Sequence, residues 1–266
     1  MSGLGRGVAV LAVCLLAACG PTESTTVASE PANGTPANET PLGSRQPTKV
    51  PPPSPAARAS EPVPAPELSV TAPPPAPAFT STVSAITPEL ASRMSPSWHP
   101  GCPVDLADLR YVTVTHHGFS AGEVAQGELV VHADVADDVA SVFRILFEAG
   151  YPVRSMRLVD DFGGSDDASM AADNTSAFNC RAITGGTEWS QHAYGRAIDL
   201  NPVENPYVLG RSVYPREGRP FADRASGPGV IQPGDAVVQA FETIGWSWGG
   251  AWASPVDYQH FSLTGG

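Results

Sequence analysis

The sequence predicts an α+β domain, with a small, mainly antiparallel sheet and a few flanking helices. Three observations support this fold class. The stretch LRYVTVTHH (109–117) alternates in polarity and is rich in β-branched residues, as strands are. The stretch VADDVASVFRILFEAG (135–150) spaces its apolar residues as a helix does and stops at Gly150. Strands and helices do not alternate regularly, which argues against a parallel βαβ sheet.

The first residues, 1–18, are typical of a secretory signal peptide. MSGLGRGVAVLAVCLLAACG carries the basic Arg6, an apolar run too short to span a bilayer, and small residues that lead to Cys19. LAAC (16–19) resembles the lipobox of bacterial lipoproteins, so we expect lipidation at Cys19 and a protein anchored to the membrane. The alternative is ordinary secretion, with cleavage near the same alanines.

Residues 19–86 are rich in Pro, Ala, Thr, Ser and Glu and contain almost no large apolar side chains. Such a composition cannot bury enough surface to offset the entropy of ordering, so it predicts a disordered linker with polyproline character. At ~3.1 Å per residue, roughly 60 residues could reach about 190 Å when fully extended. A folded domain is expected at 87–266.

The charge of the chain excludes two kinds of partner. The formal net charge is −12, and Lys49 is the single lysine. Nucleic-acid binding requires clustered Lys and Arg, and a polybasic membrane patch requires the same. We therefore expect no nucleic-acid partner and no membrane contact other than the N-terminal lipid.

The elements expected within 87–266 follow from local patterns. Thr87, followed by Pro and Glu, is a helix start. The predicted strands are 109–117, 127–134 (GELVVHAD), 151–162 (YPVRSMRLVDDF), 195–200 (GRAIDL) and 257–263 (DYQHFSL). Helices are predicted at 135–150 and 233–246 (PGDAVVQAFETIGW), and a polar loop at 163–177 (GGSDDASMAADNTSA).

Two cysteines remain once Cys14 and Cys19 are assigned to the signal segment. In an exported domain, oxidising conditions favour a disulfide between Cys102 and Cys180. The alternative is that Cys180 serves as a zinc thiolate, although no second cysteine lies nearby in the sequence.

His192 and Asp199 are candidate metal ligands. SQHAYGRAIDL (190–200) is a poor helix, and on one straight strand His192 and Asp199 would point to opposite faces. The chain must bend between them, and Gly195 allows this. A second set lies in DYQHF, where His260 and Asp257 can face the same centre. Imidazole and carboxylate suit zinc, and a catalytic zinc keeps three protein ligands and an open position for water.

The paired motifs resemble a known family. Ser190-x-His192-x-x-Gly195-x-Ala197-x-Asp199, followed by Asp257-x-x-His260, is similar to zinc-dependent peptidoglycan peptidases related to D-alanyl-D-alanine carboxypeptidases and phage L-alanyl-D-glutamate endopeptidases. The resemblance covers roughly 101–263, including WSWGGAW (246–252), and implies a Hedgehog-like and D-alanyl-D-alanine-peptidase-like fold. It implies that zinc is bound by His192, Asp199 and His260, and that Asp257 is the general base.

The sequence departs from this family at one point, because the usual arginine of an SGYR-like strand end is missing. Arg181 and Arg157 are the candidates for binding substrate and stabilising the oxyanion, and Arg181 is favoured because it closes the polar loop shortly before the metal segment. Ser190 is expected to hydrogen-bond near the zinc and contact substrate, not to act as a nucleophile, since no G-x-S-x-G surrounds it.

Other residues invite functional readings that the sequence supports less well. Trp252, with Trp246 and Trp248, either lines a substrate groove or packs the core. The adjacent His116 and His117 would face opposite ways on a strand, and His99 and His132 have no partners at ligand spacing. SDDASMAADN (165–174) is dense in oxygen atoms but has no calcium-loop pattern.

Three classes of function are compatible with these residues. The leading hypothesis is an exported, monomeric zinc peptidase, anchored at the cell membrane facing the wall, that cleaves peptidoglycan stem peptides as a carboxypeptidase or an endopeptidase. The second is a non-catalytic, zinc-containing wall-binding module, which Asp257 argues against. The third is a serine hydrolase that uses Ser190, His192 and Asp199.

Overall fold

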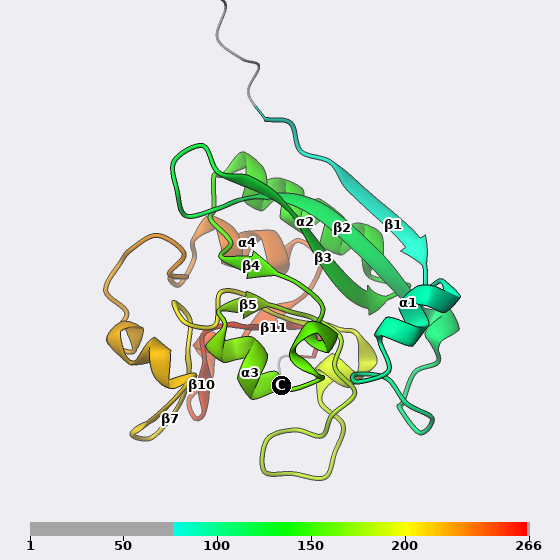
Figure 1. Ribbon diagram of the computed structural model, residues 1–266. Helices are drawn as coiled ribbons and strands as arrows, with labels where there is room; N and C mark the ends of the chain where they lie inside the picture. Colours follow the sequence, from blue (N-terminus) through cyan, green and yellow to red (C-terminus); the bar gives the residue numbers. More distant parts are fainter. Residues whose placement is uncertain (1–76, 265–266) are drawn as a thin grey trace, which may run out of the picture. The chain divides into compact units, whose positions relative to one another are not determined.

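The computed structural model describes residues 77–264 (Figure 1). The predicted signal peptide (1–18), the lipidation candidate Cys19 and most of the predicted linker (19–86) lie outside these residues. No helix within 77–264 is long and apolar enough to cross a membrane.

The described chain mixes short helices with short strands. The α-helices are α1 (Pro88–Arg93), α2 (Ala136–Glu148), α3 (Asp166–Ala171) and α4 (Ala236–Glu242). The strands are β1 (Ser81–Ala85), β2 (Leu109–His117), β3 (Val124–His132), β4 (Ser155–Met156), β5 (Asn174–Thr175), β6 (Ala197–Asp199), β7 (Tyr207–Leu209), β8 (Ser212–Tyr214), β9 (Ser247–Trp248), β10 (Val256–Asp257) and β11 (His260–Ser262).

The longest strands form an antiparallel sheet in the order β1-β2-β3, with α2 lying across one face (Figure 1). Successive side chains along each strand point to opposite faces of the sheet. Leu129 and Val131 join the core under α2, and Val130 joins a smaller cluster on the opposite face. Helix α2 buries one apolar face that includes Val139, Phe143 and Leu146, as its spacing predicts, and leaves Ile145 exposed.

Three further small sheets complete the fold. Strands β6, β11 and β9 pair antiparallel in the order β6-β11-β9, and β10, β7 and β8 pair antiparallel in the order β10-β7-β8. Strands β4 and β5 form a short parallel pair. This mixture of helices and mainly antiparallel strands is consistent with the predicted α+β class, although the strands are divided among four small sheets and do not form a single one.

The folded part begins earlier than the predicted boundary at Thr87. Residues 81–85, which we assigned to the disordered linker, form β1 and pair with β2 from Ser81↔Val114 to Ala85↔Arg110. Just before the strand, Phe79 packs against Phe147 of α2, with ring centroids 5.7 Å apart. The stretch STVSA lacks the proline of the preceding residues, so it can complete the edge of the sheet.

The segment after α2 also differs from the prediction. Of the strand expected at 151–162, only Ser155–Met156 is a strand, and Val159–Phe162 form a 3₁₀ turn. The polar loop expected at 163–177 contains helix α3. Its start is fixed by Ser165, whose side chain accepts a hydrogen bond from the Ala168 N–H. A Ser followed by two Asp is a helix-start pattern that the loop prediction overlooked.

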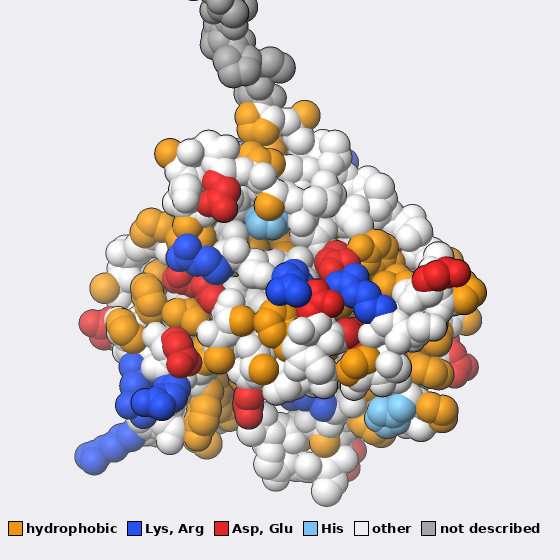
Figure 2. Space-filling model, in the orientation of Figure 1, with side chains coloured by type: hydrophobic (Ala, Val, Ile, Leu, Met, Phe, Trp, Pro, Cys, Tyr) orange, Lys and Arg blue, Asp and Glu red, His pale blue; other side chains and the backbone are white. Residues whose placement is uncertain are grey.

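The hairpin of β7 and β8 was not predicted. The 3₁₀ turn η4 (Arg216–Phe221) follows it directly. In the orientation of Figure 1, β7 lies at the lower left, and Figure 2 shows basic side chains, all of them arginines in the described residues, gathered over that part of the surface.

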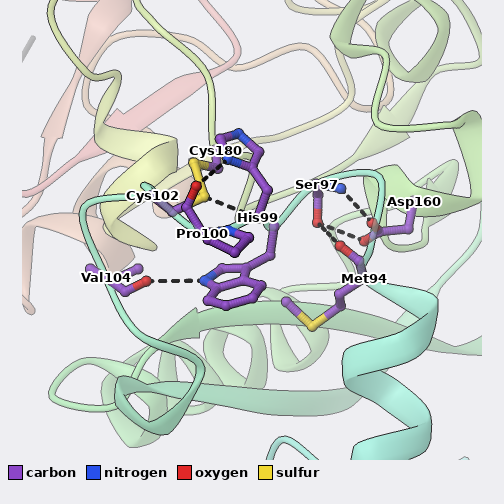
Figure 3. The surroundings of a disulfide bond; sticks show 9 residues. Met94, Ser97, His99, Pro100, Cys102, Val104, Asp160 and Cys180 are labelled. Carbon is purple, nitrogen blue, oxygen red and sulfur yellow. Dashed lines mark hydrogen bonds between the residues drawn. A yellow bond between two sulfur atoms is a disulfide. The ribbon is translucent and has the colours of Figure 1, made fainter.

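Cys102 and Cys180, the two cysteines that the sequence analysis paired, form a disulfide bond with Cα atoms 5.8 Å apart (Figure 3). The alternative use of Cys180 as a zinc thiolate is therefore wrong for this structure, although His99 lies beside the two sulfur atoms. The Cys180 N–H also donates to the Ser97 carbonyl at 3.0 Å. The disulfide and this hydrogen bond together fix the position of the segment immediately before Arg181.

We expect the disulfide to contribute measurably to stability. It closes a loop between residues 78 positions apart, and loss of such a bridge from a small exported domain typically costs ~2–5 kcal/mol. A Cys102→Ala/Cys180→Ala variant should therefore melt at a lower temperature than wild type in a calorimetric scan. Reduced wild-type protein is the matched control, and an unchanged midpoint in both samples would contradict the expectation.

Candidate metal centre

His192, Asp199 and His260 lie together in the described structure, with their ligand atoms within 4.8 Å of one another. His192 Nε2 is 3.1 Å from Asp199 Oδ2, His260 Nδ1 is 3.0 Å from Asp199 Oδ1, and the two imidazole nitrogens are 3.3 Å apart. Two ligand atoms each about 2.1 Å from a tetrahedral centre lie roughly 3.4 Å apart. The cluster therefore has close to the spacing that a bound zinc ion requires.

The β6–β11 pair positions two of these residues. Asp199 and His260 are directly opposite each other in antiparallel register, so their side chains project from the same face. The third residue, His192, lies in the 3₁₀ turn η3 (Gln191–Tyr194), which Ser190 caps by accepting a hydrogen bond from the His192 N–H. Ser190 thus orients the turn that carries His192.

The bend predicted at Gly195 is present. Gly195 ends the turn with φ +65°, a left-handed conformation that favours glycine, and β6 begins two residues later. A Cβ at this position would lie 2.6 Å from the His132 backbone nitrogen. Position 195 therefore requires glycine for two reasons, the left-handed backbone conformation and the close approach of β3. The resulting bend brings His192 back toward Asp199.

The tautomer of His192 is set by a backbone partner that the sequence did not reveal. His192 Nδ1 lies 2.6 Å from the Ala177 carbonyl oxygen, to which it donates. Nε2 then carries a free lone pair and faces Asp199 and His260. A histidine that binds metal through one ring nitrogen commonly donates from the other in this way.

The buried charges of the cluster favour a cation. Burial tends to raise the pKa of Asp199, but His192 and His260 outweigh burial and hold that pKa well below its usual range. The pKa of His192 is raised above its usual value. Burial alone would lower it, but the neighbouring Asp199 carboxylate has the stronger effect and raises it. One anion between two imidazoles, all nearly inaccessible to solvent, is a donor set that suits zinc.

Asp257 lies at the end of β10, three residues before His260, and its environment is different. Burial is the main reason that its pKa is raised to about 7, with His260 acting to lower it and Asp199 to raise it. Its Oδ1 atom is buried and has no hydrogen-bond partner among residues 77–264. A carboxylate with a raised pKa and one oxygen free of hydrogen bonds is suited to accept and release a proton.

Gly249 explains part of the Trp-Gly segment. A Cβ at Gly249 would lie 2.6 Å from the Asp257 carbonyl oxygen and 3.3 Å from the His260 Cβ. The absence of a side chain lets the turn η5 (Gly249–Ala251) pass directly against both residues. Trp252 follows η5, and its ring centroid is 5.5 Å from that of His260.

The three tryptophans differ in how deeply they are buried. Trp246 and Trp248 are buried in the core, and Trp252 is partly exposed. All three border a hollow of about 600 Å³. The lining of this hollow does not include His260, so it is the distance between the Trp252 and His260 rings, and not the hollow, that places Trp252 beside the centre.

Of the two arginine candidates, the structure brings Arg181 to the site. Burial and the Asp199 carboxylate have the larger effects on the pKa of His192, and burial, His260 and Asp199 have the larger effects on that of Asp257. The positive charge of Arg181 adds to these and lowers both pKa values. Arg157 instead pairs with Asp161 at 2.8 Å and lies over the Phe162 ring.

Sequence reasoning missed the partner of Arg181. Arg181 Nη2 lies 2.8 Å from Asp166 Oδ2 at the start of α3. The Ser165 cap, which predicts that helix, was the signal that could have placed Asp166 there. The remaining histidines do not join the centre: His116 Nδ1 contacts the His117 carbonyl, the His117 ring stacks on Phe147, and His132 contacts Asp134.

A second charged cluster lies beyond β6. Glu204 is buried, and burial together with the adjacent Asp173 carboxylate raises its pKa to about 7. Arg154 lies 3.3 Å from Glu204 Oε1 and 3.4 Å from Asp173 Oδ2. Asp173 also accepts a hydrogen bond from the Val203 N–H at 2.9 Å. The cluster thus ties β5 to the chain that follows β6.

This cluster predicts a pH-dependent stability. Because the pKa of Glu204 is higher in the folded than in the unfolded state, the folded state binds more protons between about pH 4.5 and 7, and stability falls as the pH rises through that window. One pKa unit corresponds to 1.36 kcal/mol, so the loss should be about 1–3 kcal/mol. Melting temperatures of Glu204→Gln should depend less on pH than those of wild type. The exposed Glu148→Gln is the control, and parallel pH profiles for Glu204→Gln and wild type would contradict the assignment.

Comparison with known proteins agrees with the resemblance read from the motifs. Residues 184–263 match the model of a family described as D-alanyl-D-alanine carboxypeptidase. No curated protein and no solved structure shows a significant match to the chain. The matched segment contains all three candidate ligands and Asp257. Over residues 184–263, the chain is therefore similar to the D-alanyl-D-alanine carboxypeptidase family of peptidases.

Proposed function

We propose that this protein is a zinc metallopeptidase that hydrolyses the peptide stems of cell-wall peptidoglycan. The observation that carries the proposal is the buried cluster of His192, Asp199 and His260 beside the carboxylate of Asp257, whose Oδ1 atom has no hydrogen-bond partner among residues 77–264. The match of residues 184–263 to a peptidase family supports the same chemistry.

The residues of the chain have distinct roles in this proposal. His192, Asp199 and His260 hold the zinc, which would polarise the scissile carbonyl and make the attacking water more acidic. Asp257 accepts the proton of that water and returns it to the leaving amine. Arg181, oriented by Asp166, stabilises the negative charge that develops on the carbonyl oxygen.

The environment of the site argues against Ser190 as a nucleophile. Its side chain accepts a hydrogen bond from the His192 backbone, and both ring nitrogens of His192 are directed elsewhere, to Ala177 and to Asp199. No imidazole nitrogen of His192 is left to deprotonate the Ser190 hydroxyl.

The location and partners belong to the same proposal. The signal-like residues 1–18 and Cys19 support export and a lipid anchor, which would place the peptidase at the membrane facing the wall. We propose that it acts there as a monomer on peptidoglycan stems. Replacing Cys19 by Ser should move the protein from the membrane fraction to the soluble fraction.

The test is product analysis by mass spectrometry. The full-length protein is incubated with purified peptidoglycan stems as isolated, after treatment with a chelator, and after zinc is added back. Cleavage that stops with the chelator and returns with zinc supports the proposal. Cleavage that persists in chelator and is blocked by a fluorophosphonate would show a serine hydrolase, and stem binding without any cleavage would show a binding module.

A further inference from the structure

Asp257 is one end of a row of side chains that crosses the sheet β10-β7-β8. Asp257 lies directly opposite Tyr207, which in turn lies directly opposite Tyr214. Residues opposite each other in antiparallel strands project from the same face, so these three side chains form a line. The ring centroids of Tyr207 and Tyr214 are 6.3 Å apart. Burial and then the charge of Asp257 raise the pKa of Tyr207, which agrees with its place beside the carboxylate.

The far end of this row is open to solvent. Tyr214 is 49% exposed, and so is Leu209, which shares the face of Tyr207 two residues along β7. With neighbouring strands ~4.8 Å apart, the row runs about 10 Å away from Asp257. An extended peptide advances ~3.3 Å per residue, so this strip could accommodate about three residues.

The hairpin also carries positive charge in an otherwise acidic chain. Arg211 lies in the turn between β7 and β8, and Arg216 and Arg219 lie in η4. All three are exposed and form no ion pair with any carboxylate in residues 77–264. The nearby acids in sequence are Glu217 and Asp223, fewer than the arginines, and the gathering of basic side chains is visible in Figure 2. The chain as a whole has a net charge of −12, whereas this surface is positively charged. It is therefore electrostatically complementary to an acidic ligand.

The position of Asp257 decides which part of the substrate reaches this surface. Because the base returns its proton to the leaving amine, it must lie within hydrogen-bond reach of that nitrogen. Side chains in line with Asp257 therefore lie beside the segment that leaves. A carboxypeptidase releases a single residue, which would contact only the near end of the row.

We propose that the β7–β8 hairpin and η4 bind an acidic peptide segment on the leaving side of the cleaved bond, so that the domain cuts inside peptides. Tyr207, Leu209 and Tyr214 contact the segment, and Arg211, Arg216 and Arg219 attract its carboxylates. This inference rests on the proposed peptidase function. It favours cleavage of a bond inside the stem peptide, as by an endopeptidase, over removal of a single C-terminal residue, as by a carboxypeptidase.

The test compares two peptides that share the same acyl side and scissile bond. One has a three-residue leaving segment with two acidic residues, and the other has glutamine at those two positions. We expect the full-length, zinc-loaded protein to cleave the acidic peptide with a kcat/KM about tenfold higher, an advantage that shrinks in high salt. An Arg211→Gln/Arg216→Gln/Arg219→Gln variant should lose this preference and cleave the two peptides with similar kcat/KM. Arg144→Gln, an exposed arginine on α2, is the control and should keep the preference.

A binding measurement separates this inference from the proposed function. Calorimetric titration of the zinc-loaded Asp257→Asn protein should show about tenfold weaker binding of the acidic peptide when the three arginines are also replaced. Equal cleavage of both peptides, or release of a single C-terminal residue alone, would overturn the inference while the peptidase function stands. If no peptide is cleaved, the proposed function fails, and equal binding of both peptides would then overturn the hairpin assignment as well.

Discussion

Replacement of Asp257 by Asn is expected to lower turnover by ~10²–10⁴-fold, the usual contribution of general-base assistance. The substitution keeps the shape of the side chain but removes its ability to accept the proton of the attacking water. Zinc content and melting temperature should remain near those of wild type, because no proposed ligand is changed. Stem cleavage followed by mass spectrometry gives the rate, and elemental analysis gives the metal content.

Asp199→Asn is the matched control, since it changes the other carboxylate of the site in the same way. It should weaken zinc binding itself, because Asp199 lies 3.1 Å and 3.0 Å from the two imidazoles that would share the metal. Loss of zinc from Asp257→Asn and its retention in Asp199→Asn would reverse the two roles. Wild-type rates in both variants would refute the mechanism.

The second large effect is expected at the metal ligands. Protein purified without added metal should contain about one zinc equivalent, and a His192→Ala/His260→Ala variant should contain almost none. Removing two of three ligands leaves Asp199 buried with no imidazole partner, so this variant should also melt earlier. Inductively coupled plasma mass spectrometry measures the metal.

Because such a variant could fail to fold, its circular dichroism spectrum should be recorded with the metal analysis. His116→Ala offers a control, since this histidine is also buried but lies on β2 outside the centre. Normal zinc content in the folded double variant would show that the ligands have been misassigned.

The long elements could be predicted from the sequence because their patterns are local. The helix α2 and the strand β2 each repeat their periodicity over nine or more residues, and Thr87 and Asp235 cap their helices as their positions indicate. The bend at Gly195 was predictable for the same reason, because a poor helix and a poor strand meet at a glycine.

The remaining features depend on partners distant in the sequence. Strands of two or three residues, such as β7 and β10, are held by pairing and have no periodicity of their own. Neither the Ala177 carbonyl that fixes His192 nor the Asp166 side chain that holds Arg181 leaves a local pattern near its target. Sequence reasoning could therefore name residues of the candidate site without naming the groups that orient them.

If the centre binds zinc as we propose, the pairing of Asp199 with His260 across β6 and β11 would couple metal uptake to correct strand register. A slip of one residue between these strands would turn His260 to the other face and send Phe261, which packs on Phe241, out of the core. Zinc would bind the aligned state and not the slipped one, and so would stabilise the aligned state in proportion to its concentration. The zinc concentration during maturation would then set how much of the protein reaches the correct strand register. Molecules in the slipped register would stay less stable and more susceptible to proteolysis.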